Sequence, residues 1–312
     1  MAKILTTDNL VTSLKRRAMI PTDAATFTKT DLIAILNEEV DVGLVPYLLS
    51  VHEEYLVYTV DESFTATGQQ TFKIPERAIG NKLRGAAIVD SAGNLLNLTK
   101  VEIDELDIFQ NEYDNFGDEY TYYVKNDSII VTSTAGITGS LRMYFYMTPS
   151  ELVEDKFGAV IQSINTTTGE IVVDKIPSTF TNGASYDFTK NKSPNIILNY
   201  DKVAAINTAT KVITFNTTDI PSNLVVGDYI TLAGESIVPH LPRELHPILA
   251  QRAAIHCLHA LGDDRVQMAE AKLVQMERNV IDLIDNRVET STQKIANFNS
   301  PLRQTRKYTV KD

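Results

Sequence analysis

Apolar residues follow two different periods along this chain. In residues 7–56 and 242–289 they recur every three or four positions, which is the spacing of an amphipathic helix. Between these segments they alternate with polar residues or form short runs, which predicts strands. The pattern predicts an α+β protein in which the N- and C-terminal segments form a helical bundle and the middle of the chain supplies β-rich insertions.

The N-terminal segment contains signals for where its helices begin and end. A first helix is expected over residues 8–19, and a second begins after Thr28. Asp31 follows Thr28 at the spacing of a capping box, in which each side chain bonds a backbone N–H of the first turn. Gly43 and Pro46 interrupt the apolar stripe that follows, which predicts a kink or a break.

The C-terminal segment has the clearest helical pattern. Pro242 can start a helix that runs to Leu261, where Gly262 supplies a left-handed stop. From Val266 the apolar residues alternate three and four positions apart, similar to a coiled-coil seam. We expect this second helix to pack on another helix through Leu273, Met276, Val280 and Leu283.

The middle of the chain contains an internal repeat. Residues 160–186 and 203–229 share the pattern I-N-T-x-T, then I, then I-P-S, then G and Y. Such self-similarity indicates two copies of one small β unit, arranged as a compact barrel or as paired hairpins. Before the repeat, five strands are expected within residues 70–146, and residues 148–151 have the residue types of a short helix.

These patterns divide the chain into four parts. A discontinuous helical core is expected over residues 1–57 and 239–296, a first β region with short helices over 58–157, and the duplicated β insertion over 158–238. Residues 297–312 lack periodicity, contain several basic residues, and are expected to form an extended tail.

Charge excludes one broad class of function. The 312 residues include 40 Asp and Glu against 29 Lys and Arg, and the net charge of -11 would repel a phosphate backbone. A sequence-specific nucleic-acid reader is therefore not expected. No stretch approaches the roughly 20 apolar residues that a membrane helix needs, so no membrane association is expected.

Residue types with catalytic potential do not form a recognisable constellation. His256 and His259, together with His240, His246 and Cys257, raise the possibility of a zinc site. Their spacing fits zinc poorly, and core or interface histidines are the simpler interpretation. Gly80 and Gly85 have the spacing of a phosphate loop but lack its Lys and Ser/Thr. We therefore expect no enzyme activity, no metal and no cofactor.

Four segments have motifs that belong together. Residues 28–58 contain N-E-E-V-D-V-G-L-V-P and S-V-H-E-E-Y, and residues 74–85 read I-P-E-R-A-I-G-N-K-L-R-G. Residues 242–254 read P-R-E-L-H-P-I-L-A-Q-R-A-A, and residues 300–303 read S-P-L-R. Together these segments resemble head-to-tail adaptor proteins of short-tailed and crAss-like bacteriophages. The duplicated β unit lies outside this resemblance.

The resemblance implies a virion component of the neck, assembled in the host cytoplasm. Such a protein forms a homo-oligomeric ring, typically a dodecamer, that docks on the portal protein and connects it to tail or further ring proteins. Genomic DNA passes through its channel without sequence-specific binding, which agrees with the acidic composition.

The extended tail is the segment expected to reach the portal or an adjacent subunit. The acid-rich residues 101–119 of another copy are one candidate acceptor for its basic side chains. The expected docking residues are Arg287, Leu302, Arg303, Arg306 and Tyr308.

Two other functions stay open at this point. The duplicated β units could bind carbohydrate in a tail or baseplate protein, with Phe180, Tyr186, Phe215 and Tyr229 as the aromatic residues they offer. A tail-associated hydrolase would need a positioned pair of acids, and the sequence does not single one out.

Overall fold

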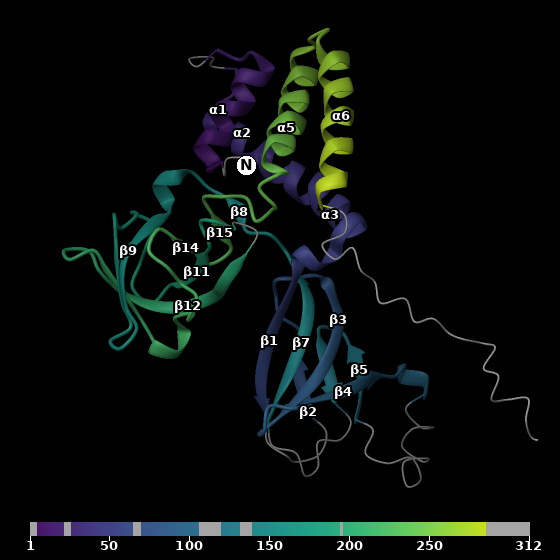
Figure 1. Cartoon of the computed structure of the whole chain (residues 1–312), viewed down its shortest axis with the longest axis vertical. Helices are drawn as coiled ribbons and strands as arrows, with labels where there is room; N and C mark the ends of the chain where they lie inside the picture. The colour runs from purple at the N-terminus through teal and green to yellow at the C-terminus, as the bar shows by residue number, and fades with distance from the viewer. Residues whose placement is uncertain are drawn as a thin grey trace, which may run out of the picture.

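Helices gather at one end of the protein and two β units at the other (Figure 1). The computed structural model describes residues 5–21, 26–64, 70–105, 120–131, 139–193 and 196–284. Its α-helices and its π-helix come from both ends of the chain, and short 3-10 turns lie between them. The helices are α1 (Thr7–Ala18), α2 (Lys29–Glu38), the π-helix η1 (Glu39–Leu44), α3 (Val45–His52), α5 (His246–Leu261) and α6 (Val266–Ile284).

Local sequence explains two of the helix boundaries. The backbone N–H of Thr28 donates to Asp31 at 2.8 Å and that of Asp31 donates to Thr28 Oγ1 at 3.2 Å, so the expected capping box starts α2. Gly262 has a φ of 65° at the end of α5, which is the left-handed stop that the sequence predicted.

At Gly43 and Pro46, where the sequence predicted a kink or a break, the chain forms a π-helix. The N–H of Val45 donates to the carbonyl of Val40, five residues back, and Val45 itself keeps helical angles. The helix therefore widens here and continues into α3. A Cβ at Gly43 would lie 2.8 Å from Nη1 of Arg252 and 2.9 Å from Oε2 of Glu39, so a larger residue here would require these two side chains to shift.

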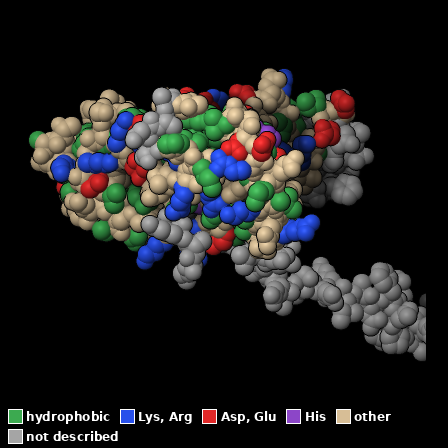
Figure 2. Space-filling view, turned by 90° about the horizontal axis from the view of Figure 1, so that it is seen from above, with side chains coloured by type: hydrophobic (Ala, Val, Ile, Leu, Met, Phe, Trp, Pro, Cys, Tyr) green, Lys and Arg blue, Asp and Glu red, His purple; other side chains and the backbone are tan. Residues whose placement is uncertain are grey.

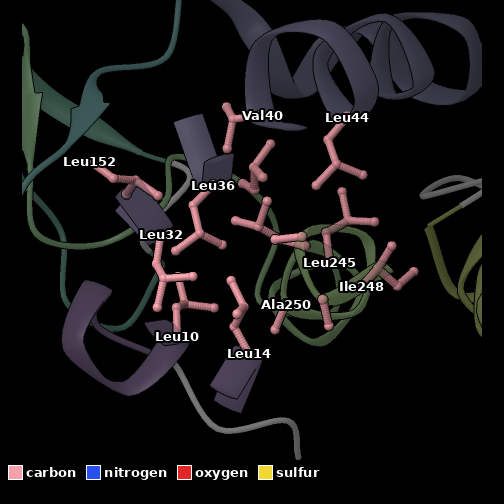
Figure 3. Close-up of a cluster of buried hydrophobic side chains, with 14 of the residues drawn as sticks. Leu10, Leu14, Leu32, Leu36, Val40, Leu44, Leu152, Leu245, Ile248 and Ala250 are labelled. Atoms are coloured by element: carbon pink, nitrogen blue, oxygen red, sulfur yellow. The ribbon is translucent and has the colours of Figure 1, made fainter. Parts of the chain in front are cut away.

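One apolar cluster joins the helices. Figure 3 shows Leu32 and Leu36 of α2 converging with Leu245 and Ile248 on the same interior space, and Leu10 belongs to the same cluster. Each of these five side chains is fully buried or nearly so. By contrast, α6 contributes only partly buried side chains, so it lies against the outside of this cluster.

The first β unit is a seven-stranded sheet with the order β1-β7-β3-β4-β5-β6-β2. All neighbouring strands are antiparallel except β4 and β5. Its fully buried side chains include Ile88, Ile129, Leu141 and Phe145. The strands are β1 (Val57–Phe64), β2 (Gln70–Lys73), β3 (Ala78–Asp90), β4 (Leu95–Lys100), β5 (Tyr120–Lys125), β6 (Ser128–Val131) and β7 (Gly139–Met147).

The second β unit is a closed six-stranded barrel with the order β10-β13-β12-β11-β14-β9. It has its own core, which includes Ile171, Tyr186, Phe188 and Ile213. Its strands are β9 (Ala159–Asn165), β10 (Glu170–Val173), β11 (Ser185–Thr189), β12 (Ile197–Asn207), β13 (Val212–Phe215) and β14 (Tyr229–Leu232). A short parallel pair, β8 (Glu151–Leu152) and β15 (Glu235–Ser236), connects the barrel to the helices.

The internal repeat has a structural counterpart in this barrel. Exchanging β9, β10 and β11 for β12, β13 and β14 leaves the order of strands around the barrel unchanged. The tight turns also correspond, because Asn165 accepts from the N–H groups of residues 167 and 168 as Asn207 does from those of residues 209 and 210. Two copies of a three-stranded unit therefore close on each other around a two-fold relation.

The expected architecture was wrong in its specific form, although the general α+β class holds. A helical bundle of the terminal segments was expected to be the framework, with the β segments as insertions. Instead, more described residues lie in strands than in α-helices, and the sheet and the barrel each bury a core of their own. Helical periodicity located the helices, but it could not show that the β segments would bury cores separate from the helical one.

The helix expected at residues 148–151 was also wrong. Residues 148–150 have no regular structure, and Glu151 begins strand β8. The backbone N–H of Ser150 is used for a tertiary hydrogen bond to His240, which a local helix would have reoriented.

Candidate functional site

The described residues of the expected helix seam lie on the inner side of α6. Leu273, Met276 and Val280 are partly buried against the helical cluster. Leu283 lies in α6, but its side chain is outside the described part of the structure. The expected docking residues all lie outside the described residues. These docking residues are Arg287, Leu302, Arg303, Arg306 and Tyr308.

Two polar bridges fix α6 beside α5. Arg252 of α5 donates to Glu277 Oε1 of α6 at 2.6 Å and lies 3.7 Å from Glu39 of the π-helix. Gln251 accepts from Arg17 of α1 at 2.7 Å and donates to the Ala269 carbonyl of α6 at 3.2 Å. The orientation of α6 therefore depends both on its apolar seam and on hydrogen bonds from partly and fully buried polar groups.

A buried ion pair joins the sheet to the barrel. Arg77, in the turn before β3, donates to Asp187 of β11 at 2.6 Å and to Ser150 Oγ at 2.6 Å. Asp187 is fully buried and the Arg77 side chain is 13% exposed. Because a charge buried this deeply needs its partner, the ion pair fixes the barrel relative to the sheet.

Further bonds complete the environment of Asp187. Its carboxylate also accepts the backbone N–H groups of Asp201 at 3.0 Å and Gly234 at 3.1 Å. The guanidinium carbon of Arg77 lies 5.8 Å from the centre of the Tyr200 ring, within range of a cation–π interaction. We call Arg77, Asp187, Ser150 and its neighbour His240 the polar junction.

His240 connects the junction to the chain that enters α5. The N–H of Ser150 donates to its Nδ1 at 3.2 Å, so the neutral ring has its proton on Nε2, which lies 3.1 Å from Thr189 Oγ1. Burial, assisted by the charge of Arg77, lowers the pKa of His240 to about 3. The ring therefore acts as a neutral structural bridge at physiological pH.

Two hollows flank Arg77. One, of about 400 Å³, is lined in part by Asn37, Asp41 and Glu151, and the other, of about 530 Å³, by residues that include Asp61 and Asp201. Burial and then the Glu151 carboxylate raise the pKa of Asp41. The Ser150 hydroxyl, which lines the first hollow, accepts a hydrogen bond from Arg77, so the polar groups around this hollow belong to the contact that positions the sheet and the barrel.

The histidine and cysteine residues considered for zinc are separate in the described structure. His246 accepts the N–H of Leu5 at Nδ1 and bonds the Leu241 carbonyl through Nε2, while His259 pairs with Glu270. Burial raises the pKa of Cys257 to about 11, which suits a buried apolar side chain. Within the described ranges, no group of three or more His, Cys, Asp or Glu residues could hold a metal ion.

The aromatic residues of the duplicated unit are used inside the barrel. Phe180, Tyr186 and Phe215 are buried, and they contact one another edge to face. Tyr229 is partly buried, and its hydroxyl donates to Asn191. These side chains do not form an exposed platform on which a sugar could stack, which weighs against the carbohydrate-binding alternative.

A scan against models of known protein families found no match, and no curated protein sequence is significantly similar to this chain. Among the described helices, none combines the length and the apolar character that crossing a bilayer requires.

Sequence reasoning did not identify the polar junction. Arg77 lies within the 74–85 segment that was noted only for its resemblance, and Asp187 stands between the buried residues Tyr186 and Phe188. An acid between two core aromatics is a weak signal on its own. Its partner lies 110 positions away, and no local pattern links the two.

Proposed function

We propose that this protein is a non-enzymatic head-to-tail adaptor of a tailed bacteriophage. It forms a ring, with a dodecamer as the expected assembly, that docks on the portal protein and continues to tail or further ring proteins. Its location is the neck of the virion, and genomic DNA passes through the ring without sequence-specific contacts.

One observation carries this proposal: segments that carry the adaptor resemblance but lie far apart in sequence contact one another. Arg252, within residues 242–254, lies 3.7 Å from Glu39, and Arg84, within residues 74–85, lies 3.3 Å from Glu53. A resemblance spread over remote segments has more weight when those segments form one continuous part of the subunit.

Assembly of the full-length protein tests the proposal directly. Purified protein, alone and mixed with its cognate portal protein, is examined by native mass spectrometry and electron microscopy. A closed ring attached to the portal is expected. A protein that stays monomeric with portal present, and is missing from mature particles, would rule the adaptor function out.

The tail-docking part of the proposal has a separate test. Deleting residues 297–312 is expected to abolish capture of portal in a pull-down while the circular dichroism spectrum stays unchanged. Reversing only Arg303 and Arg306 to Glu is expected to weaken capture in the same direction, because these charges are the proposed contact. Unchanged capture by the truncated protein would contradict this role for the tail.

A further inference from the structure

The outer face of α6 presents side chains that the subunit itself leaves exposed. Met268 is 77% exposed and Val274 is 50% exposed, although α6 packs through its other side. Lys272 and Arg278 are also exposed and make no ion pair with any described residue. Glu270 is exposed as well but pairs with His259, so this face combines apolar side chains with two cations that have no ion-pair partner in the described part of the chain.

A second exposed face runs along α2 into the π-helix. It includes Ala34, Glu38, Asp41 and Val42, and Val42 is 75% exposed. Neither Glu38 nor Asp41 forms an ion pair within the described part of the chain. The face thus combines apolar and negatively charged side chains, the complement of the α6 face.

These two faces lie on different sides of the helical end. Figure 1 shows α5 between α2 and α6, and α5 packs against both. Seen from above, the surface around the helices has Lys and Arg side chains interspersed with apolar and acidic ones (Figure 2). Because α5 separates the faces, one copy cannot bring its own α6 face onto its own α2 face.

We propose that the α6 face of one copy docks on the α2–η1 face of the next copy of this chain. Met268 and Val274 would pack towards Ala34 and Val42, with Lys272 and Arg278 opposite Glu38 and Asp41. Two different surfaces of one chain that bind each other give a head-to-tail contact, and such contacts close into a ring when the rotation permits. This inference rests on the proposed ring and specifies its subunit interface.

Charge reversal on each face tests the pairing. The Lys272→Glu/Arg278→Glu variant and the Glu38→Lys/Asp41→Lys variant are each expected to weaken self-association by at least about tenfold, because like charges then face each other. The chain with all four substitutions restores opposite charges and is expected to regain the ring. Association is measured by sedimentation velocity and native mass spectrometry, alone and with portal protein.

A matched control separates this pairing from a general charge effect. Lys125 and Lys192 are exposed residues of the two β units, and Lys125→Glu/Lys192→Glu changes the net charge by the same amount as the α6 variant. It is expected to assemble like the parent. Met268→Ser, at a highly exposed position that cannot disturb the core, is expected to weaken association about threefold through lost apolar contact.

The outcomes distinguish this interface from the adaptor function. Rings that form unchanged in the α6 variant, or a folded four-substitution chain that fails to recover, overturn the interface and leave the adaptor proposal standing. A parent chain that stays monomeric with and without portal overturns both. Circular dichroism and thermal unfolding verify that each variant is folded.

Discussion

The helical cluster and the polar junction hold the protein together by opposite means. In the cluster, side chains such as Leu14, Leu36 and Leu48 are fully buried, and each contributes by excluding water from apolar surface. In the junction, Arg77 and Asp187 form a buried ion pair, and each depends on the other.

The difference teaches how each region should respond to change. An apolar core loses stability in proportion to the volume removed, because the remaining side chains still exclude water. A buried ion pair responds abruptly, because removing one partner leaves the other charged and desolvated. The junction is therefore where a single substitution should have its largest effect on how the sheet and barrel are joined.

The largest effect is expected from Arg77→Met. This change leaves the Asp187 carboxylate buried with only neutral donors, and we expect it to lower the free energy of unfolding by about 4 kcal/mol. Denaturant unfolding followed by circular dichroism measures the loss. Combining it with Asp187→Asn should recover part of that loss, and simple additivity of the two changes would argue against direct coupling.

A somewhat smaller effect is expected from Leu36→Ala in the helical cluster. The side chain is fully buried, and its truncation should lower the free energy of unfolding by about 3 kcal/mol through lost burial and a new cavity. Leu36→Met, which conserves volume, serves as the control and should cost under about 1.5 kcal/mol. Equal losses in the two variants would mean that this site is not packed as described.

The junction should also respond to acid, through the buried ring of His240. The pKa of His240 falls from about 6.5 in an unfolded chain to about 3 in the fold, so the unfolded state binds the proton first as pH falls. Stability contributed by the neutral ring is thus complete above pH 6.5 and declines towards pH 3. Between pH 7 and pH 5 this loss is on the order of 2 kcal/mol.

His240→Asn tests that response, because Asn Oδ1 can still accept the Ser150 N–H but does not titrate. The variant should lose less stability than the parent between pH 7 and pH 5, whatever its stability at neutral pH. His259→Asn, at an exposed position on α5, is the control and should retain the parent's acid dependence. Parallel pH profiles for His240→Asn and the parent would exclude His240 as the cause.

The smallest effect is expected from an exposed ion pair of similar geometry. Arg142 donates two hydrogen bonds of 2.7 Å to Asp61 on the sheet surface, but both side chains are substantially exposed. Arg142→Met should change the free energy of unfolding by only about 0.5 kcal/mol, because water already solvates both charges. A loss as large as that of Arg77→Met would show that burial is not what separates the two pairs.

Several features of the fold could be anticipated because their causes are local. Thr28 and Asp31 lie three residues apart and make the capping box, and Gly262 ends α5 with its own backbone angles. The repeat was visible because two stretches of chain use the same turn residues, such as Asn165 and Asn207. Interactions of this kind involve neighbours in the sequence, so the sequence alone determines them.

Other features depend on which distant segments meet. The sequence divided the middle of the chain into two β regions, but it did not show that the sheet and the barrel would each bury a core of their own, so the helices were given too large a share of the framework. Arg252 of α5 comes close to Gly43 of the π-helix, and the buried carboxylate of Asp187 is paired with Arg77, which lies 110 positions away. The sequence by itself determined the periods, the caps and the duplication. Only the tertiary structure decided which polar groups would be buried together, because the free energy of a buried charge is set by its final neighbours and not by its position in the chain.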